Sequence, residues 1–142
     1  MSELKGKIDF TLFISADNAN PNGDPLNGNR PRINMDGYGE ISDVCIKRKI
    51  RNRLQDLGQK IFVQSDDRTD DGYTSLKDRA DSCEELKAEM GNKKKADRDV
   101  CAAIACKEWM DVRTFGQVFA FKGSQVSFGV RGPVSIHQAV SL

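Results

Sequence analysis

The sequence predicts an α+β fold in which a strand and a basic helix are followed by a helical insertion and closing strands. Three observations favour this order: alternating apolar residues near the start, apolar positions at helical spacing through the middle, and short β-type runs separated by Gly and Pro near the end. At 142 residues the chain has room for one modest domain. We expect this domain to comprise residues 8–63 (strand, glycine-rich loop and basic helix), 64–110 (helical insertion) and 111–142 (closing strands).

The first predicted element is a strand near the start of the chain. Ile8, Phe10, Leu12 and Ile14 alternate with mostly polar residues, which is typical of a strand with one buried face. Phe13 lies on the opposite face of this strand. An aromatic residue there stacks on a base in sheet-type RNA binders, or it packs beneath an insertion.

A long, structured loop and a helix are expected next. Residues 17–40 are dense in Asn, Gly, Pro and Asp, which form consecutive tight turns whose backbone amides can also bind anions. Ser42 or Asp43 can cap the helix, and Gly58 can end it in a left-handed conformation. Its apolar positions fall within one sector and are expected to pack on the sheet: Ile46, Ile50, Leu54 and Leu57.

Residues 47–53 of this helix carry five positive charges and no acidic residue. Like charges at helical spacing repel, whereas phosphates would neutralise them and release condensed counterions. The alternative is a solvated helix face whose acidic partners come from elsewhere, such as residues 66–71. The motif favours contact with RNA or DNA, with three cations gathered along one flank: Lys47, Arg48 and Arg51.

The rest of the chain first returns to helices and then to strands. Residues 64–75 are acidic and turn-rich, so we expect a solvated excursion. Apolar residues at helical spacing predict one helix from Leu76 to Met90 and another from Val100 to Trp109. Three β-type runs close the sequence: Val112–Phe121, Val126–Val130 and Val134–Ile136.

Composition argues against several classes of protein. The formal net charge is +1, so any attraction to nucleic acid must be local. The four cysteines match neither a disulfide framework nor a common zinc spacing, and no Walker or dinucleotide-binding motif is present. No apolar run approaches the length of about 18 residues that spans a bilayer, and the start does not resemble a signal peptide. We expect a cytoplasmic protein with no cofactor and no metal.

Acidic loop residues are candidates for a nuclease site, because hard divalent cations that promote phosphodiester cleavage prefer oxygen ligands. The candidates are Asp24, Asp36 and Asp43. Asp43 is more simply a helix cap, and the other two are ordinary turn residues. His137 has no recognisable acid or nucleophile partner. We therefore expect no catalytic residue and no enzymatic activity.

Four segments resemble, in the same order, the Cas7 family of CRISPR Cascade backbone subunits, subtype I-C. They are residues 20–32 (NPNGDPLNGNRPR), 37–52 (GYGEISDVCIKRKIRN), 111–118 (DVRTFGQV) and 131–136 (RGPVSI). The resemblance implies an RRM-like, ferredoxin-type sheet backed by helices, with a projecting helical insertion. It also implies a non-catalytic protein that coats guide RNA, assembles with further copies of itself and with other Cascade subunits, and meets target DNA through the guide.

In that family the guide is held by its sugar-phosphate backbone, without reading of its sequence. The residues of this chain that the resemblance assigns to guide contact are Arg30 and Arg32 in the loop, and Lys47, Arg48 and Arg51 on the helix. Arg113 and Arg131 are weaker candidates. A structural salt bridge is the alternative for Arg113, and a role in shaping a turn is the alternative for Arg131.

Family members are substantially longer than this chain, so we expect the amino-terminal portion only, without the second helix-strand half and the projecting thumb. A sheet that lacks strand partners would leave unpaired edges, which predicts association through an edge, as a dimer or by strand exchange. Two other functions stay open. One is a metal-dependent ribonuclease that uses Asp24, as in type III backbone subunits. The other is an interaction-only fragment without RNA affinity.

Overall fold

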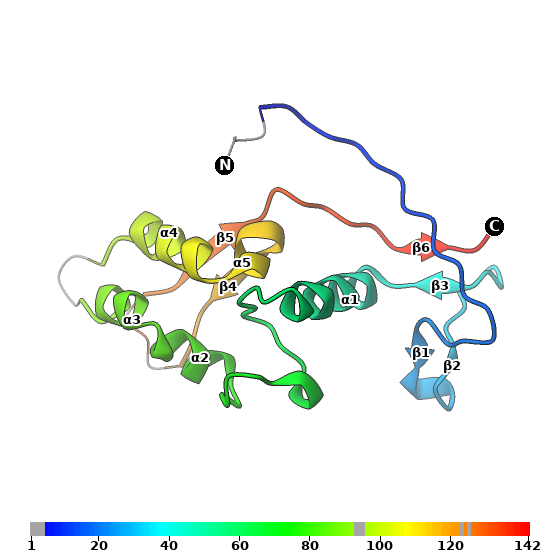
Figure 1. Cartoon of the computed structure of the whole chain (residues 1–142), viewed down its shortest axis with the longest axis horizontal. Coiled ribbons are helices and arrows are strands. Elements are labelled where there is room, and N and C mark those ends of the chain that lie inside the picture. Colours follow the sequence, from blue (N-terminus) through cyan, green and yellow to red (C-terminus); the bar gives the residue numbers. More distant parts are fainter. Residues whose placement is uncertain (1–4, 93–95, 123, 125) are drawn as a thin grey trace. The chain divides into compact units, whose positions relative to one another are not determined.

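The structure, a computed structural model, describes residues 5–92, 96–122, 124 and 126–142 (Figure 1). The chain divides into two compact units. Unit 1 comprises Met1–Ile41 with Val140–Leu142, and unit 2 comprises Ser42–Ala139. Each unit is described by itself.

Unit 1 consists of tight turns and very short strands. Strand β1 (Gly23–Asp24) pairs antiparallel with β2 (Arg30–Pro31), and the 3-10 helix η1 (Pro25–Asn27) lies between them. The turn closes through Gly28 and Asn29, whose φ angles of 61° and 57° are left-handed. Strand β3 (Glu40–Ile41) pairs with β6 (Ala139–Val140). The predicted long loop is therefore structured, as its turn-forming composition indicated.

The strand predicted over residues 8–14 is not present. This stretch is an elongated segment without secondary structure (Figure 1). Its apolar side chains are exposed, and Phe13 reaches 81% exposure. The physical reason is that the backbone of residues 8–15 has no hydrogen-bonded neighbour among the described residues. Alternation alone does not make a strand when no second strand accepts its hydrogen bonds.

Unit 2 begins with helix α1 (Asp43–Asp56), whose predicted bounds are confirmed. Ser42 is the N-cap, and its Oγ accepts a hydrogen bond of 3.2 Å from the Cys45 amide. Gly58 follows the helix with a φ of +76°, the expected left-handed stop. Of the apolar stripe predicted to pack on a sheet, Ile46 is buried, whereas Leu57 at the far end is exposed.

The helix predicted from Leu76 to Met90 is divided in two, and the helix predicted from Val100 to Trp109 is followed by a further short helix, because the backbone is extended at two residues. Cys83 separates α2 (Leu76–Ser82) from α3 (Glu84–Met90), and Trp109 separates α4 (Arg98–Glu108) from α5 (Met110–Phe115). Residues 64–75 contain the 3-10 helix η2 (Asp66–Arg68).

Strands β4 (Gly116–Phe119) and β5 (Phe128–Arg131) form an antiparallel hairpin in which Phe119 pairs with Phe128. Two β-type predictions are corrected here. Residues 112–115 belong to α5, because the backbone turns out of its helix only at Gly116, where φ is +80°. Residues 134–136 form no strand.

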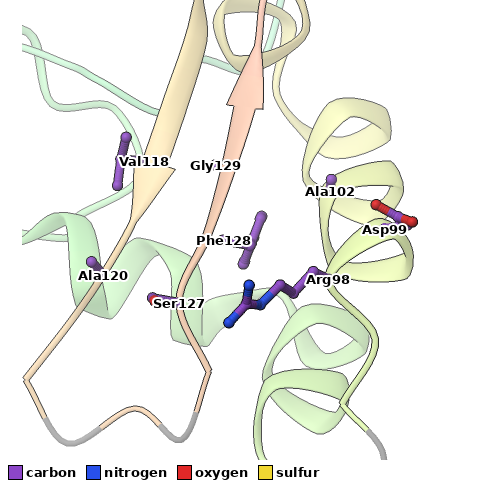
Figure 2. A pocket seen from close by; sticks show the side chains of 8 residues that line it. All are labelled: Arg98, Asp99, Ala102, Val118, Ala120, Ser127, Phe128 and Gly129. Carbon is purple, nitrogen blue, oxygen red and sulfur yellow. The ribbon is translucent and has the colours of Figure 1, made fainter.

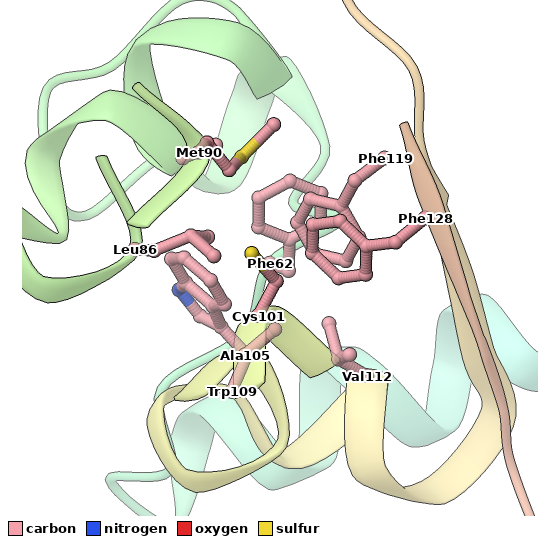
Figure 3. Packing of buried hydrophobic residues seen from close by; sticks show 10 residues of the cluster. Phe62, Leu86, Met90, Cys101, Ala105, Trp109, Val112, Phe119 and Phe128 are labelled. Carbon is pink, nitrogen blue, oxygen red and sulfur yellow. The ribbon is translucent and has the colours of Figure 1, made fainter. Parts of the chain in front are cut away.

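The core of unit 2 is an aromatic cluster between the helices and the β4–β5 hairpin (Figure 3). Phe119 stacks on Phe128 with ring centroids 4.6 Å apart, and Phe62 lies 4.8 Å from Phe119 and 4.7 Å from Trp109. Such pairs add to the stabilisation from burial. Helices and small antiparallel sheets confirm the α+β class and are compatible with an RRM-like fold. Within the described residues, no helix has the length and apolarity needed to cross a membrane.

Candidate nucleic-acid interface

The seven basic residues predicted to contact a guide are divided between the two units. Arg30 and Arg32 belong to unit 1, whereas the other five belong to unit 2: Lys47, Arg48, Arg51, Arg113 and Arg131. The structure therefore describes two separate groups of cations, each with its own local geometry.

Arg30 is an exposed cation on a rigid turn. It lies in β2 directly opposite Asp24 of β1, and the hairpin closes with a hydrogen bond of 2.8 Å from the Asn29 amide to the Asp24 carbonyl. Within the part of the chain that the structure describes, Arg30 makes no ion pair. The Asp24 carboxylate instead accepts a hydrogen bond of 3.1 Å from the Leu26 amide and caps η1. Arg30 is thus positioned by backbone geometry and keeps its charge available.

Arg32 is partly neutralised within its own unit. Its Nε lies 3.2 Å from Glu40 Oε1, yet 46% of its side chain remains exposed. Its amide donates to the Asn22 carbonyl and its carbonyl accepts from the Glu40 amide, each at 2.9 Å. This backbone pairing fixes the direction of Arg32 although its ion pair is exposed and therefore weak.

The flank of α1 is less free than its sequence suggested. Lys47 Nζ lies 2.9 Å from Asp43 Oδ2, one turn earlier in the helix. This contact also lowers the pKa of the Asp43 carboxyl, chiefly through the hydrogen bond from Lys47. The basic run itself contains no acidic residue, but Lys47 pairs at i,i+4 with an acid that precedes the run.

Arg51 is held by a buried carboxylate and an aromatic ring. Its Nε lies 3.0 Å from Oδ2 of Asp111, and the two side chains are 12% and 1% exposed. Its guanidinium also lies over the ring of Phe115, 5.1 Å from the centroid. Asp111 and Phe115 are one turn apart in α5, so a single short helix contacts this guanidinium through both side chains. The acidic partner of Arg51 is thus Asp111, 60 positions away, and not one of residues 66–71, where the sequence suggested acidic partners.

Arg48 is half-buried beside this pair. Its Nη1 donates a hydrogen bond of 2.7 Å to the Val63 carbonyl. Burial lowers the pKa of Arg48, and the neighbouring charge of Arg51 lowers it further, against smaller opposing effects of Asp111 and Asp67. Among the described residues Arg48 forms no salt bridge, so its charge is an excess beside the neutral pair of Arg51 and Asp111.

The two weaker candidates lie elsewhere in unit 2. Arg113 forms no salt bridge with any described residue; its Nη1 donates 3.0 Å to the carbonyl of Cys106, near the end of α4. The predicted alternative, a structural salt bridge, is not present among the described residues; Arg113 donates to a backbone carbonyl instead. Arg131 is exposed at the end of β5, opposite Gly116.

Two comparisons with known proteins bear on this arrangement of cations. The family described as CRISPR-associated protein Cas7 matches residues 6–142. This chain belongs to the Cas7 family. A relative of that name from Haloferax volcanii is 36% identical over 122 residues, which cover 80% of this chain and 32% of the relative. The Cas7 chain described here thus spans about a third of the length of that relative.

Sequence reasoning missed a second charged cluster in this Cas7 chain, centred on Arg79 of α2. The Arg79 side chain is buried and donates to both oxygens of Asp71, at 2.5 Å and 2.9 Å. Its Nη1 also donates 3.0 Å to the Phe62 carbonyl. The hydrogen bonds with Asp71 raise the pKa of Arg79, and those with Arg79 lower the pKa of Asp71. Arg79 is adjacent to Ala80 in the apolar repeat of α2. This position was the signal in the sequence that the arginine would be buried.

The other residues considered for chemistry are dispersed. Among the described residues, no three His, Cys, Asp or Glu side chains are grouped so as to hold a metal ion. Asp36 lies in a turn in which its amide donates 3.0 Å to Asn34 Oδ1. Phe13 and His137 are exposed. The four cysteines are free thiols.

Proposed function

We propose that this Cas7-family chain is a backbone subunit of a type I-C Cascade complex. It binds the sugar-phosphate backbone of a guide RNA without sequence specificity and assembles with further copies along the guide. It meets target DNA through the guide and contacts other Cascade subunits. Family membership supports this proposal, and the chain represents the amino-terminal portion of the longer subunit.

The observation that carries the proposal is the excess of positive charge on α1. Arg51 pairs with the buried Asp111, whereas Arg48 beside it forms no salt bridge with a described residue. Lys47, which pairs with Asp43, continues the same flank. Burying a second cation beside a pair that is already neutral is unfavourable, and a bound phosphate would compensate the excess charge. The flank therefore favours a polyanionic partner.

The seven candidate residues divide into two roles in this proposal. Arg30, Arg32, Lys47, Arg48 and Arg131 contact phosphates, because each keeps part of its side chain exposed. Arg51 and Arg113 act mainly within the protein, since their guanidinium groups donate to Asp111 and to a helix carbonyl.

The ribonuclease alternative depends on Asp24, and the geometry does not favour it. The Asp24 carboxylate accepts from the Leu26 amide and stands opposite Arg30 in a hairpin. Incubating labelled RNA with magnesium tests this alternative directly: the proposal expects intact RNA, whereas site-specific cuts that disappear in Asp24→Ala would favour the nuclease.

Fluorescence anisotropy of labelled single-stranded RNA at several salt concentrations tests the proposed binding. On single strands, log K should fall with log salt by about 0.7 for each phosphate contacted. Arg48→Gln should weaken binding and reduce that slope by about one contact. Arg53→Gln is the matched control, because Arg53 is an exposed cation of the same helix outside the proposed flank. Two RNAs of different sequence should bind alike.

Three results would count against the proposal. Wild-type protein that binds RNA without salt dependence would contradict contact with phosphates. Equal losses in Arg48→Gln and Arg53→Gln would show that the flank of α1 has no special role. Strong preference for one RNA sequence would contradict a coat that reads no bases.

A further inference from the structure

The two peptide groups of Phe62 and Val63 are bonded entirely by charged side chains. The Phe62 amide donates 2.7 Å to Asp111 Oδ1, and the Val63 amide donates 3.0 Å to Asp111 Oδ2. The Phe62 carbonyl accepts from Arg79, and the Val63 carbonyl accepts from Arg48. This dipeptide, which we call the 62–63 junction, is held as a strand would be, but by side chains from three helices.

Asp111 is the shared member of the contacts around this junction. Its carboxylate accepts from both junction amides and, at 3.0 Å, from Arg51 Nε. All three partners are donors, so the buried site requires a group that only accepts. Phe115 lies against the remaining face of the Arg51 guanidinium. Asp111 bonds both to Arg51 of α1 and to the 62–63 junction, which Arg48 of α1 also contacts. Helix α1 is therefore held at two positions and cannot rotate about its axis without breaking these bonds.

We infer that Asp111 is a positioning residue of the RNA-binding surface, which fixes α1 through Arg51 so that the exposed parts of Arg48 and Lys47 are directed to phosphates. The inference rests on the proposed function, since it concerns how the same flank is presented to RNA. Neither Asp111 nor the 62–63 junction contacts RNA. Their part is to set the direction of the charges that do.

Asp111→Asn is a sharp test, because the loss of its negative charge and the loss of its positioning role should change the affinity for RNA in opposite directions. The substitution removes a negative charge next to the cationic flank, so charge alone would raise the affinity for RNA. An amide NH2 in this site would face donors, so Arg51 would lose its acceptor and α1 its fixed orientation. Position predicts a fall in affinity of about tenfold, comparable to losing one charged hydrogen bond.

Asp81→Asn is the matched control for Asp111→Asn. It makes the same change in net charge and removes the carboxylate partner of Lys77, and neither residue bonds to the 62–63 junction. Neither residue belongs to the proposed RNA-binding flank, so Asp81→Asn should leave the affinity equal to or above that of the wild type. Both variants are compared by anisotropy at a temperature where circular dichroism shows them folded.

A double-variant cycle shows whether Arg51 acts through Asp111. Arg51→Gln alone should weaken RNA binding, and adding it to Asp111→Asn should cause little further loss, since both remove the same link. If Asp111→Asn does not fold, Phe115→Leu decides the question. It removes the ring against Arg51, keeps the buried carboxylate, and should lower the affinity without changing net charge.

The outcomes separate the two proposals. Salt-dependent binding by wild type together with a gain in Asp111→Asn equal to that in Asp81→Asn would overturn the positioning role and leave the proposed function standing. Unchanged affinity in a folded Phe115→Leu would also overturn it. Wild-type protein without salt-dependent RNA binding would contradict the proposed function itself.

Discussion

The two units of this chain hold their cations in opposite ways. In unit 1 a backbone turn places Arg30, and its side chain stays exposed without an ion pair among the described residues. In unit 2 Arg51 is held by a buried carboxylate and an aromatic ring. No described residue of unit 1 is buried, whereas unit 2 contains an aromatic core. The comparison teaches that a turn can present a charge directly, while a helix needs a packed interior to orient one.

Hydrogen exchange gives the largest expected contrast between the units. Amides of residues 8–15 have no hydrogen-bond acceptor among the described residues, so they should exchange close to unprotected rates. Amides of β4 and β5 should be slower by about a thousandfold or more, because they open with the core. Mass spectrometry of peptides from both regions makes the measurement. Equal protection would contradict the difference between the units.

Phe119→Ala should destabilise unit 2 by about 3–5 kcal/mol, because it leaves a cavity among four aromatic neighbours. Urea denaturation followed by Trp109 fluorescence measures the change. The control is Val118→Ala, one residue earlier in the same strand, whose side chain is 67% exposed and which should cost about 0.5 kcal/mol or less. A similar loss in both variants would mean that the aromatic core is not the main source of the stability of unit 2.

Gly116→Ala tests the bend that ends α5 and begins β4. Gly116 has a φ of +80°, and an added Cβ would lie 2.4 Å from the Val130 carbonyl oxygen. We expect a loss of about 3 kcal/mol from strain and displaced backbone, measured by thermal unfolding. In Gly129→Ala, in the paired strand, the added Cβ meets open space, so the stability should change little. A tolerated Gly116→Ala would show that this bend can relax.

Acid should weaken unit 2 through Asp71. The ion pair with Arg79 lowers the pKa of Asp71 in the folded state. Its contribution is therefore complete above the unfolded pKa of about 4 and is lost as the pH falls through the lower folded value. Urea midpoints between about pH 2 and pH 6 should fall less steeply in Asp71→Asn than in wild type. Parallel slopes would exclude this pair as a source of acid sensitivity.

Local signals made part of this structure predictable. Ser42 and Gly58 mark the ends of α1, since a cap and a left-handed stop are set by neighbouring backbone groups. The break at Cys83 was not predictable, because apolar spacing continues across it. The end of a helix at Trp109 was predicted, but the short helix α5 that follows was not. The α+β class was predicted from the change of the apolar pattern from helical to β-type spacing near Asp111. In the structure the last helix ends and the strand begins a few residues later, at Gly116.

The candidate site was predictable only as a set of residues. The basic run of α1 is evident in the sequence, but its pairing depends on contacts over 60 positions for Arg51 and 15 for Arg48. No i,i+4 rule reaches such partners. Phe13 shows the opposite failure, because its alternating neighbours predict a strand that the structure does not contain. Whether these cations contact RNA stays a prediction.

The two ends of the stretch over residues 64–110 are fastened to each other. The Val63 amide donates to Asp111, and the Met110 amide donates 2.9 Å to the Lys60 carbonyl. A segment whose two ends lie side by side can be lengthened at small entropic cost, about 0.6 kcal/mol for each doubling of a flexible loop. Because these two hydrogen bonds hold the ends of the segment together, relatives could carry a longer or different segment here without a change in the backbone on either side of it.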